Sequence, residues 1–222
     1  MVQTLGHADR SIDKELAALC ANLSKMGEKV LAQLGLVQQA LRTPKPEQIE
    51  QAKNLDKQIN TLEKEVEEEI MGFFARHQPL LVELRFVTFS MKLAMILERM
   101  GDLAKNTVRR LNKLGKPIGT DMAQDLEKMT QATMDLLKSS LQMLFHFNTE
   151  MAKTWTKRDD AIDALYKKIK KSLRAELEQS PAHAQFLGKL KQVAVNLERS
   201  GDFSTDITRI LYLIHTGERL GK

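Results

Sequence analysis

The chain has 222 residues, of which 42% are hydrophobic and 28% charged, a balance typical of a protein that buries a sizeable core. The net charge of +5 raises nucleic acid or anionic lipid as partners, but the 34 Lys and Arg are interleaved with 29 Asp and Glu, and this interleaving favours a solvated surface over a nucleic-acid-binding one. The single cysteine, Cys20, excludes an intramolecular disulfide and fits a reducing compartment. No signal peptide and no run of ~18 apolar residues is visible. We therefore expect a cytoplasmic protein without a membrane span.

The composition predicts an all-helical fold, because Pro, Gly and aromatic residues are few and good helix formers dominate. Apolar side chains recur at helical spacing over residues 9–42, the first predicted helix. A stretch with two prolines follows, and a second helix should run from Ile49 to about 75–79. Pro79 is expected at the first position of a third helix, which should continue to about Leu114.

Residues 115–120, with two glycines and a proline, are the best candidate for a linker between two halves. Beyond them, a fourth helix is expected over Leu126 to Leu144, although Thr133 interrupts its apolar face. A fifth is expected around Ile162 to Leu173. The second half therefore repeats the plan of the first.

A sixth helix should close the chain. Ser180 and Pro181 predict its N-cap and first residue. It should run to about Thr216, where Gly217 can adopt the left-handed conformation of a C-cap.

A sequence repeat supports the division into halves. Residues 97–102 read LERMGD and residues 197–202 read LERSGD. Arg109 and Arg209 share the same offset, and segments beginning at Asp56 and at Asp159 also match. We therefore predict two pseudo-symmetric three-helix bundles in tandem, formed by residues 1–114 and 121–222.

The repeated motif places acidic side chains on one helix face in each half. Positions i, i+4 and i+8 project together, which groups Glu98 with Asp102 and Asn106. Like charges at i and i+4 destabilise a helix by a few tenths of a kcal/mol, and an interior glycine costs ~1 kcal/mol relative to Ala. Both destabilising features occur in each half, which suggests that another interaction compensates for them. The equivalent residues of the second half are Glu198, Asp202 and Asp206.

A cation site in each half is one explanation. The neighbouring helix offers Asp56 and Asn60 in the first half, and Asp159 and Asp163 in the second, with Asp160 less well aligned. Oxygen ligands suit divalent or trivalent ions such as iron, manganese, magnesium or calcium, with zinc on carboxylates also open. They do not suggest a Cys/His zinc site. The metal identity stays open.

Intrahelical ion pairing is the simpler explanation. Asp102 can meet Lys105 and Asp206 can meet Arg209, each at i+3. The glycines of the motif, Gly101 and Gly201, would then serve only to let another helix approach closely. The motif also repeats an arginine, at Arg99 and Arg199.

An enzyme is weakly supported. Carboxylate-bridged oxidases in helical bundles use a Glu-x-x-His pair, which this chain lacks, and none of its five histidines lies near the motif. No phosphate-binding P-loop is present either. Three interpretations therefore stay open: a metal-binding regulatory adaptor, a carboxylate-bridged metalloenzyme and a purely structural helical bundle.

The ordered motifs resemble the PhoU family of phosphate transport and signalling accessory proteins. The family signature, Glu-Arg-x-Gly-Asp-x-x-x-Asn, is matched by residues 97–106, and further matching segments are HQPLLVELRF (77–86), RDDAIDALY (158–166) and LYLIHTGER (211–219). Two departures stand out: Asn60 replaces a usual Asp, and Asp206 a usual Asn. The resemblance covers roughly residues 10–219.

The resemblance implies a non-catalytic, often dimeric protein with metal clusters on the acidic surface that the motif builds. Such a protein represses phosphate uptake and phosphate-starvation signalling when phosphate is plentiful. The implied partners are the ATPase of the phosphate ABC transporter and the phosphate sensor histidine kinase. These partners would recruit a cytoplasmic protein to the inner face of the membrane.

Overall fold

The structure is a computed structural model that describes residues 10–115, 117–154 and 156–220, except the side chains of Arg10 and residues 156–159. Within these ranges the chain is helical and forms no strand, which confirms the all-α prediction. The elements in chain order are α1 (Arg10–Arg42), α2 (Pro46–Arg76), α3 (Leu81–Asn112), α4 (Thr120–Phe145), α5 (Thr149–Lys153), α6 (Thr156–Gln179), η1 (Pro181–His183) and α7 (Ala184–Thr216).

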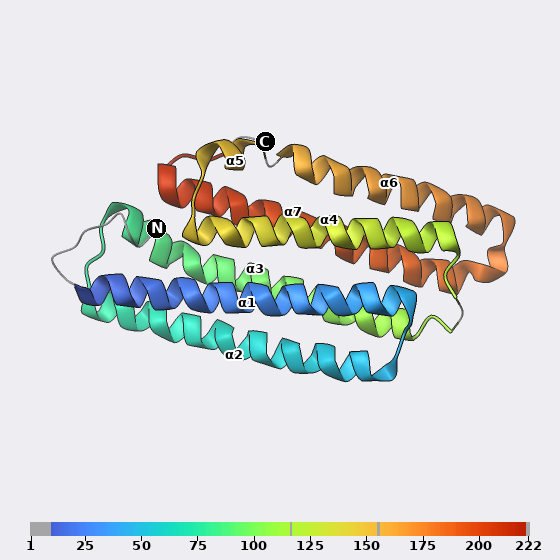
Figure 1. Ribbon diagram of the computed structural model, residues 1–222, viewed down its shortest axis with the longest axis horizontal. Helices are drawn as coiled ribbons and strands as arrows, with labels where there is room; N and C mark the ends of the chain where they lie inside the picture. Colours follow the sequence, from blue (N-terminus) through green and yellow to red (C-terminus); the bar gives the residue numbers. More distant parts are fainter. Residues whose placement is uncertain (1–9, 116, 155, 221–222) are drawn as a thin grey trace.

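The six long helices form one elongated assembly (Figure 1). α1, α2 and α3 pack against one another, as do α4, α6 and α7. The two groups meet where α1 packs on α4 and α3 on α7, so α2 and α6 lie at opposite outer edges (Figure 1). A helix of 33 residues such as α1 is about 50 Å long at 1.5 Å per residue.

One hydrophobic core runs through both groups of helices. Leu23 on α1, Leu97 on α3, Leu137 on α4 and Leu197 on α7 are almost fully buried members of it. Removal of this apolar surface from water is the main favourable contribution to folding. The helices that carry the repeated motif, α3 and α7, therefore form part of the centre of the molecule.

The contact between α4 and α7 is lined by buried hydroxyls. Thr133, which interrupts the apolar face of α4, donates a hydrogen bond to the Met129 carbonyl of its own helix. Ser140 lies 3.1 Å from the Thr208 hydroxyl across the helix pair. Because these hydroxyls are hydrogen-bonded, small polar residues can be buried here without the cost of an unpaired group.

Two predicted helix starts differ from the structure. Pro79 does not begin α3, since Leu80 is still extended (φ −122°, ψ 152°) and the helix begins at Leu81. Pro181 does follow Ser180 as the first residue of a helical turn, but that turn is the short 3-10 helix η1. Proline fits any position that needs φ near −65°, so it marks such starts only to within a few residues.

The end of α7 matches the prediction. Gly217 is its C-cap in the left-handed conformation, with φ of 77°, and its N–H donates to the Leu213 carbonyl. The short helix α5 is not predicted from the apolar pattern, because five residues are too few to show a helical period. Its local signal is Asn148, whose side chain caps the helix by accepting from the Met151 N–H.

None of the helices in the described ranges is long and apolar enough to cross a membrane.

Candidate carboxylate site

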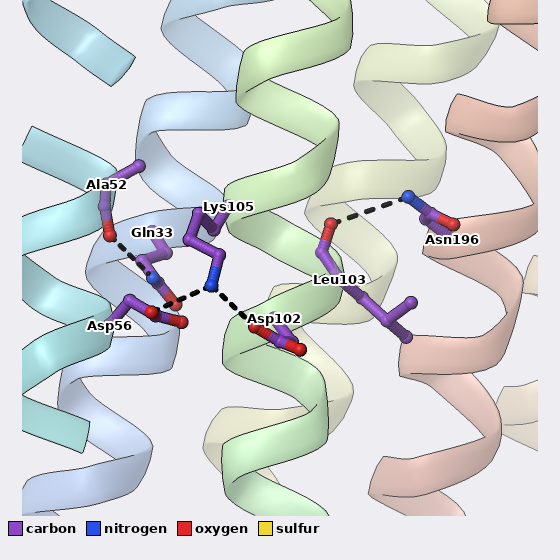
Figure 2. A network of polar contacts seen from close by, with 7 residues as sticks. All are labelled: Gln33, Ala52, Asp56, Asp102, Leu103, Lys105 and Asn196. Carbon is purple, nitrogen blue, oxygen red and sulfur yellow. Dashed lines mark hydrogen bonds and ion pairs between the residues drawn. The ribbon is translucent and has the colours of Figure 1, made fainter. Parts of the chain in front are cut away.

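In the first half, the motif on α3 meets α2 through a lysine. Lys105 Nζ lies 2.6 Å from Asp102 Oδ1 on its own helix and 2.7 Å from Asp56 Oδ2 on α2 (Figure 2). The side chain of Asp56 is only 12% exposed and that of Lys105 26% exposed. The ammonium group thus joins two helices through two carboxylates, one of which is largely buried.

Glu98 lies in the same acidic surroundings. Burial raises its pKa above the usual range, and the negative charges of Asp102, Glu63 and Asp56 raise it further, while Lys105 acts in the opposite direction. Two carboxylates four positions apart on α3 therefore do repel each other, as the sequence indicates.

The sequence reasoning missed Glu63. Burial and the neighbouring charge of Glu67 raise the pKa of the Glu63 carboxyl. The spacing in the sequence would have identified this residue, because Glu63 follows Asp56 by seven positions and so lies on the same face of α2. Asn60, midway between them, is exposed, and Asn106 on α3 is half-buried.

We define the first-half site as Asp56, Glu98 and Asp102, with Lys105 between the two aspartates. Within the described residues, no group of three or more His, Cys, Asp or Glu side chains is placed to hold a metal ion. The first-half residues do not fit a metal ion, because the ammonium of Lys105 fills the position between the carboxylates of α2 and α3.

In the second half, the described ion pair of the motif is formed within α7 itself. Arg209 Nη1 lies 3.1 Å from Asp206 Oδ1 on the same helix, and both side chains are partly exposed. Glu198 is half-buried and Asp202 is exposed on α7, while Asp163 on α6 is half-buried. The side chain of Asp159 lies outside the described residues, and the less well-aligned Asp160 is exposed.

The residue equivalent to Lys105 in the second half is Thr205. It is buried on α7, and its hydroxyl has no hydrogen-bond partner among the residues that the structure describes. A threonine at this position carries no charge, so α7 supplies no cation at the place where α3 supplies Lys105. The two halves therefore differ in charge at the centre of the repeated motif.

The glycines of the motif are buried on α3 and α7. A Cβ on Gly101 would lie 2.8 Å from Ile59 Cδ1 on α2 and 3.1 Å from Gln33 Oε1 on α1. Both distances are shorter than ordinary van der Waals contact, so three helices converge closely at Gly101. Gly201 is likewise buried. The motif arginines Arg99 and Arg199 are exposed in both halves.

The intrahelical ion pairs predicted from the sequence are both present. Asp102 pairs with Lys105, and Asp206 pairs with Arg209. The interhelical pair between Lys105 and Asp56 was missed, because the sequence does not say which lysine of α3 faces α2. Lys105 follows Glu98 by seven positions, which would have placed it on the face of the motif.

The motif helices also connect the two halves. Asn196 on α7 donates hydrogen bonds to the Thr107 hydroxyl at 3.0 Å and to the Leu103 carbonyl at 3.5 Å, both on α3 (Figure 2 shows the second). The motif of one half therefore lies next to a buried polar contact with the other.

Fold and site together define a class: an all-helical tandem bundle with an acidic motif repeated on one central helix of each half. Comparison with known families agrees, since the sequence model described as the PhoU domain matches twice, at residues 23–111 and 126–211. The chain belongs to the PhoU family.

Relatives and solved structures support this assignment. The chain is 30% identical over 216 residues to a phosphate-specific transport system accessory protein PhoU homolog of Caulobacter vibrioides, covering 96% of this chain and 94% of the relative. It is 28% identical over 212 residues to the homolog of Rhizobium meliloti, covering 95% and 90%. The crystal structure of PhoU from Pseudomonas aeruginosa superposes with a TM-score of 0.85 at 25% identity, covering 93% of this chain and 99% of that one.

Proposed function

We propose that this protein is a regulatory adaptor that represses phosphate uptake and phosphate-starvation signalling when phosphate is plentiful. The observation that carries the proposal is the match of the PhoU domain to both halves, together with relatives named as accessory proteins of the phosphate-specific transport system. The relatives are named as accessory proteins rather than as enzymes, and no catalytic role is proposed for this chain.

The adaptor would act by contact with the ATPase subunit of the phosphate ABC transporter and with the phosphate sensor histidine kinase. The exposed arginines Arg99 and Arg199 support contact with a partner, because they recur at one position of the repeated motif. Neither makes an ion pair within the described residues. A repeated exposed charge without an internal role is available for a partner's acidic groups. The protein would be cytoplasmic and homodimeric, and its partners would recruit it to the membrane.

Metal binding is proposed for the second half only. The carboxylates concerned are Glu198, Asp202 and Asp206 on α7, with Asp163 and Asp159 on α6. The described members do not form a group of three by themselves, so a cation here would need Asp159 as an additional ligand. Iron, manganese, zinc, magnesium and calcium all accept carboxylate oxygens, and a bound ion would offset the repulsion along α7.

The direct test is uptake of radiolabelled phosphate by cells grown in abundant phosphate. Deletion of the gene should raise the uptake rate, and a plasmid copy of the wild-type gene should restore repression. A deletion strain with unchanged uptake and unchanged expression of phosphate-starvation genes would contradict the proposed function. A strain complemented by a frameshifted copy serves as the control.

A further inference from the structure

We propose that Lys105 is the resident cation of the first-half site, so that this half of the protein binds no metal ion. Any metal ion held by the repeated motif then belongs to the second half. The inference concerns the first half alone, and it holds whether or not the second half binds a metal and whether or not the chain regulates phosphate uptake.

The position of the ammonium group carries the argument. Lys105 Nζ reaches Asp56 Oδ2 and Asp102 Oδ1 at 2.7 and 2.6 Å, which are short, charge-assisted hydrogen bonds. A metal ion bridging the same two carboxylates would sit at roughly 2.0–2.6 Å from their oxygens. The ammonium and such an ion would occupy the same space between α2 and α3 and cannot be present together (Figure 2).

The charge on Lys105 is stable. A lysine side chain carries a positive charge at neutral pH, and both of its short contacts here are to carboxylate oxygens. A metal ion could bind here only if the Lys105 ammonium group first left its partly buried position between the two carboxylates.

The buried partner explains why the cation is needed. The Asp56 side chain is 12% exposed, and a carboxylate at that depth loses hydration that an adjacent positive charge compensates. Glu98 and Glu63 add further negative charge nearby. Lys105 thus performs in the first half the charge compensation that a bound cation would otherwise provide.

The second half lacks this arrangement on its motif helix. Thr205 occupies the position equivalent to Lys105, and the Arg209 guanidinium pairs with Asp206 on the same helix. α3 and α7 therefore share the Glu and Asp of the motif, but Asp206 replaces Asn106 and an uncharged threonine replaces the cation Lys105. This difference predicts different responses of the two halves to added metal.

The first arm of the test measures metal content. Wild type, Asp102→Asn and Asp202→Asn are dialysed against MnCl₂, then against metal-free buffer, and manganese is measured by elemental analysis. The proposal predicts the same manganese content in Asp102→Asn as in wild type. Loss of manganese in Asp102→Asn would overturn it, because that result would place a metal ion in the first half. Asp102 is half-exposed, so the variant should fold.

The second arm measures thermal unfolding of Lys105→Met with and without MnCl₂. Its melting temperature should fall below that of wild type and rise with Mn²⁺ by more than wild type does, because the vacated position accepts a cation. Lys53→Met is the control, since the described partner of Lys53 is Glu50 at 2.7 Å and the two side chains are 50% and 69% exposed, so no buried carboxylate loses its cation. A melting temperature equal to wild type without Mn²⁺ would overturn the proposal.

If Lys105→Met does not fold, the double variant Asp56→Asn/Lys105→Met replaces it. This variant removes the buried negative charge as well, so its melting temperature should not respond to Mn²⁺.

Discussion

Asn196 and Thr107 form a buried hydrogen bond between the two halves, with Asn196 Nδ2 3.0 Å from Thr107 Oγ1. Asn196 lies on α7 and Thr107 on α3, and both are almost fully buried. Gln192 completes the arrangement by donating to Asn196 Oδ1 from one turn earlier on α7. The pair therefore fixes the register between the two helices that carry the repeated motif.

Asn196→Ala should lower the free energy of unfolding by about 1–3 kcal/mol, because a buried amide and its hydrogen bonds are lost. Urea unfolding followed by circular dichroism measures the change. Asn54→Ala is the matched control, since Asn54 is exposed on α2 and its replacement should leave stability within about 0.5 kcal/mol. Equal effects at the two positions would show that the contact between α3 and α7 does not depend on Asn196.

Gly101→Ala should destabilise the protein. The new Cβ would lie 2.8 Å from Ile59 Cδ1 at the end of a side chain that is only 1% exposed, so relief of the contact requires repacking of the core. Overpacking of this kind costs about 1–3 kcal/mol, against ~1 kcal/mol gained from helix propensity. Gly188 on α7 has no atom within 4 Å of an added Cβ. Gly188→Ala should therefore stabilise the protein by up to ~1 kcal/mol. Chemical denaturation of both variants tests the pair, and a stabilising Gly101→Ala would refute close helix packing as the role of this glycine.

Glu98→Gln should stabilise the protein at neutral pH. Burial and the charges of Asp102, Glu63 and Asp56 raise the pKa of Glu98 above its ordinary value of 4.5, so the folded state disfavours the ionised form. The folded state then binds more protons than the unfolded state, and stability falls as the pH rises through the raised pKa. The gain from Glu98→Gln should be present at pH 7 and vanish below about pH 4.

Melting curves of Glu98→Gln at pH 4 and pH 7 provide the measurement. Glu68→Gln on the exposed side of α2 is the control and should show no such difference. A Glu98→Gln variant less stable than wild type at pH 7 would mean that the ionised carboxylate has a favourable partner.

Acid should weaken the contact around His215. This side chain stacks on Phe147 with ring centroids 4.0 Å apart, and burial, with a contribution from Arg85, lowers the pKa of His215 to about 4. The unfolded chain takes up this proton near pH 6.5, so stability should decrease as the pH falls from 6.5 towards about 4. Thermal unfolding across this range should show a smaller loss for His215→Phe. His146→Phe, at an exposed position, should keep the wild-type loss, and identical profiles for all three proteins would contradict the assignment.

Most of the fold could be predicted from the sequence, because the helical spacing of apolar residues extends over many residues and the LERMGD and LERSGD repeats reveal the duplication. Gly217 was predictable as a C-cap, since a left-handed residue there requires almost no side chain. The start of α3 could not be predicted to the residue, because Leu80 and Leu81 follow Pro79 without a capping side chain that would mark the boundary. Helix α5 depends on a local cap by Asn148 and is too short to produce a period.

The contacts of the candidate carboxylate site could be predicted from the sequence only in part. Spacing on one helix predicted the pairs between Asp102 and Lys105 and between Asp206 and Arg209, because i+3 contacts are local. The reach of Lys105 to Asp56 depends on how α2 and α3 are rotated against each other, which spacing on a single helix does not determine. Metal binding by the second half stays a prediction.

The central claim is that the protein regulates phosphate transport by binding a partner. The most direct measurement is the affinity of the purified chain for the purified ATPase subunit of the host's phosphate importer, obtained by isothermal titration calorimetry. Wild type should bind, and Arg99→Ala/Arg199→Ala should bind at least several-fold more weakly while melting at the wild-type temperature. Absence of binding by the wild-type chain, to the ATPase and to the sensor kinase alike, would contradict the account.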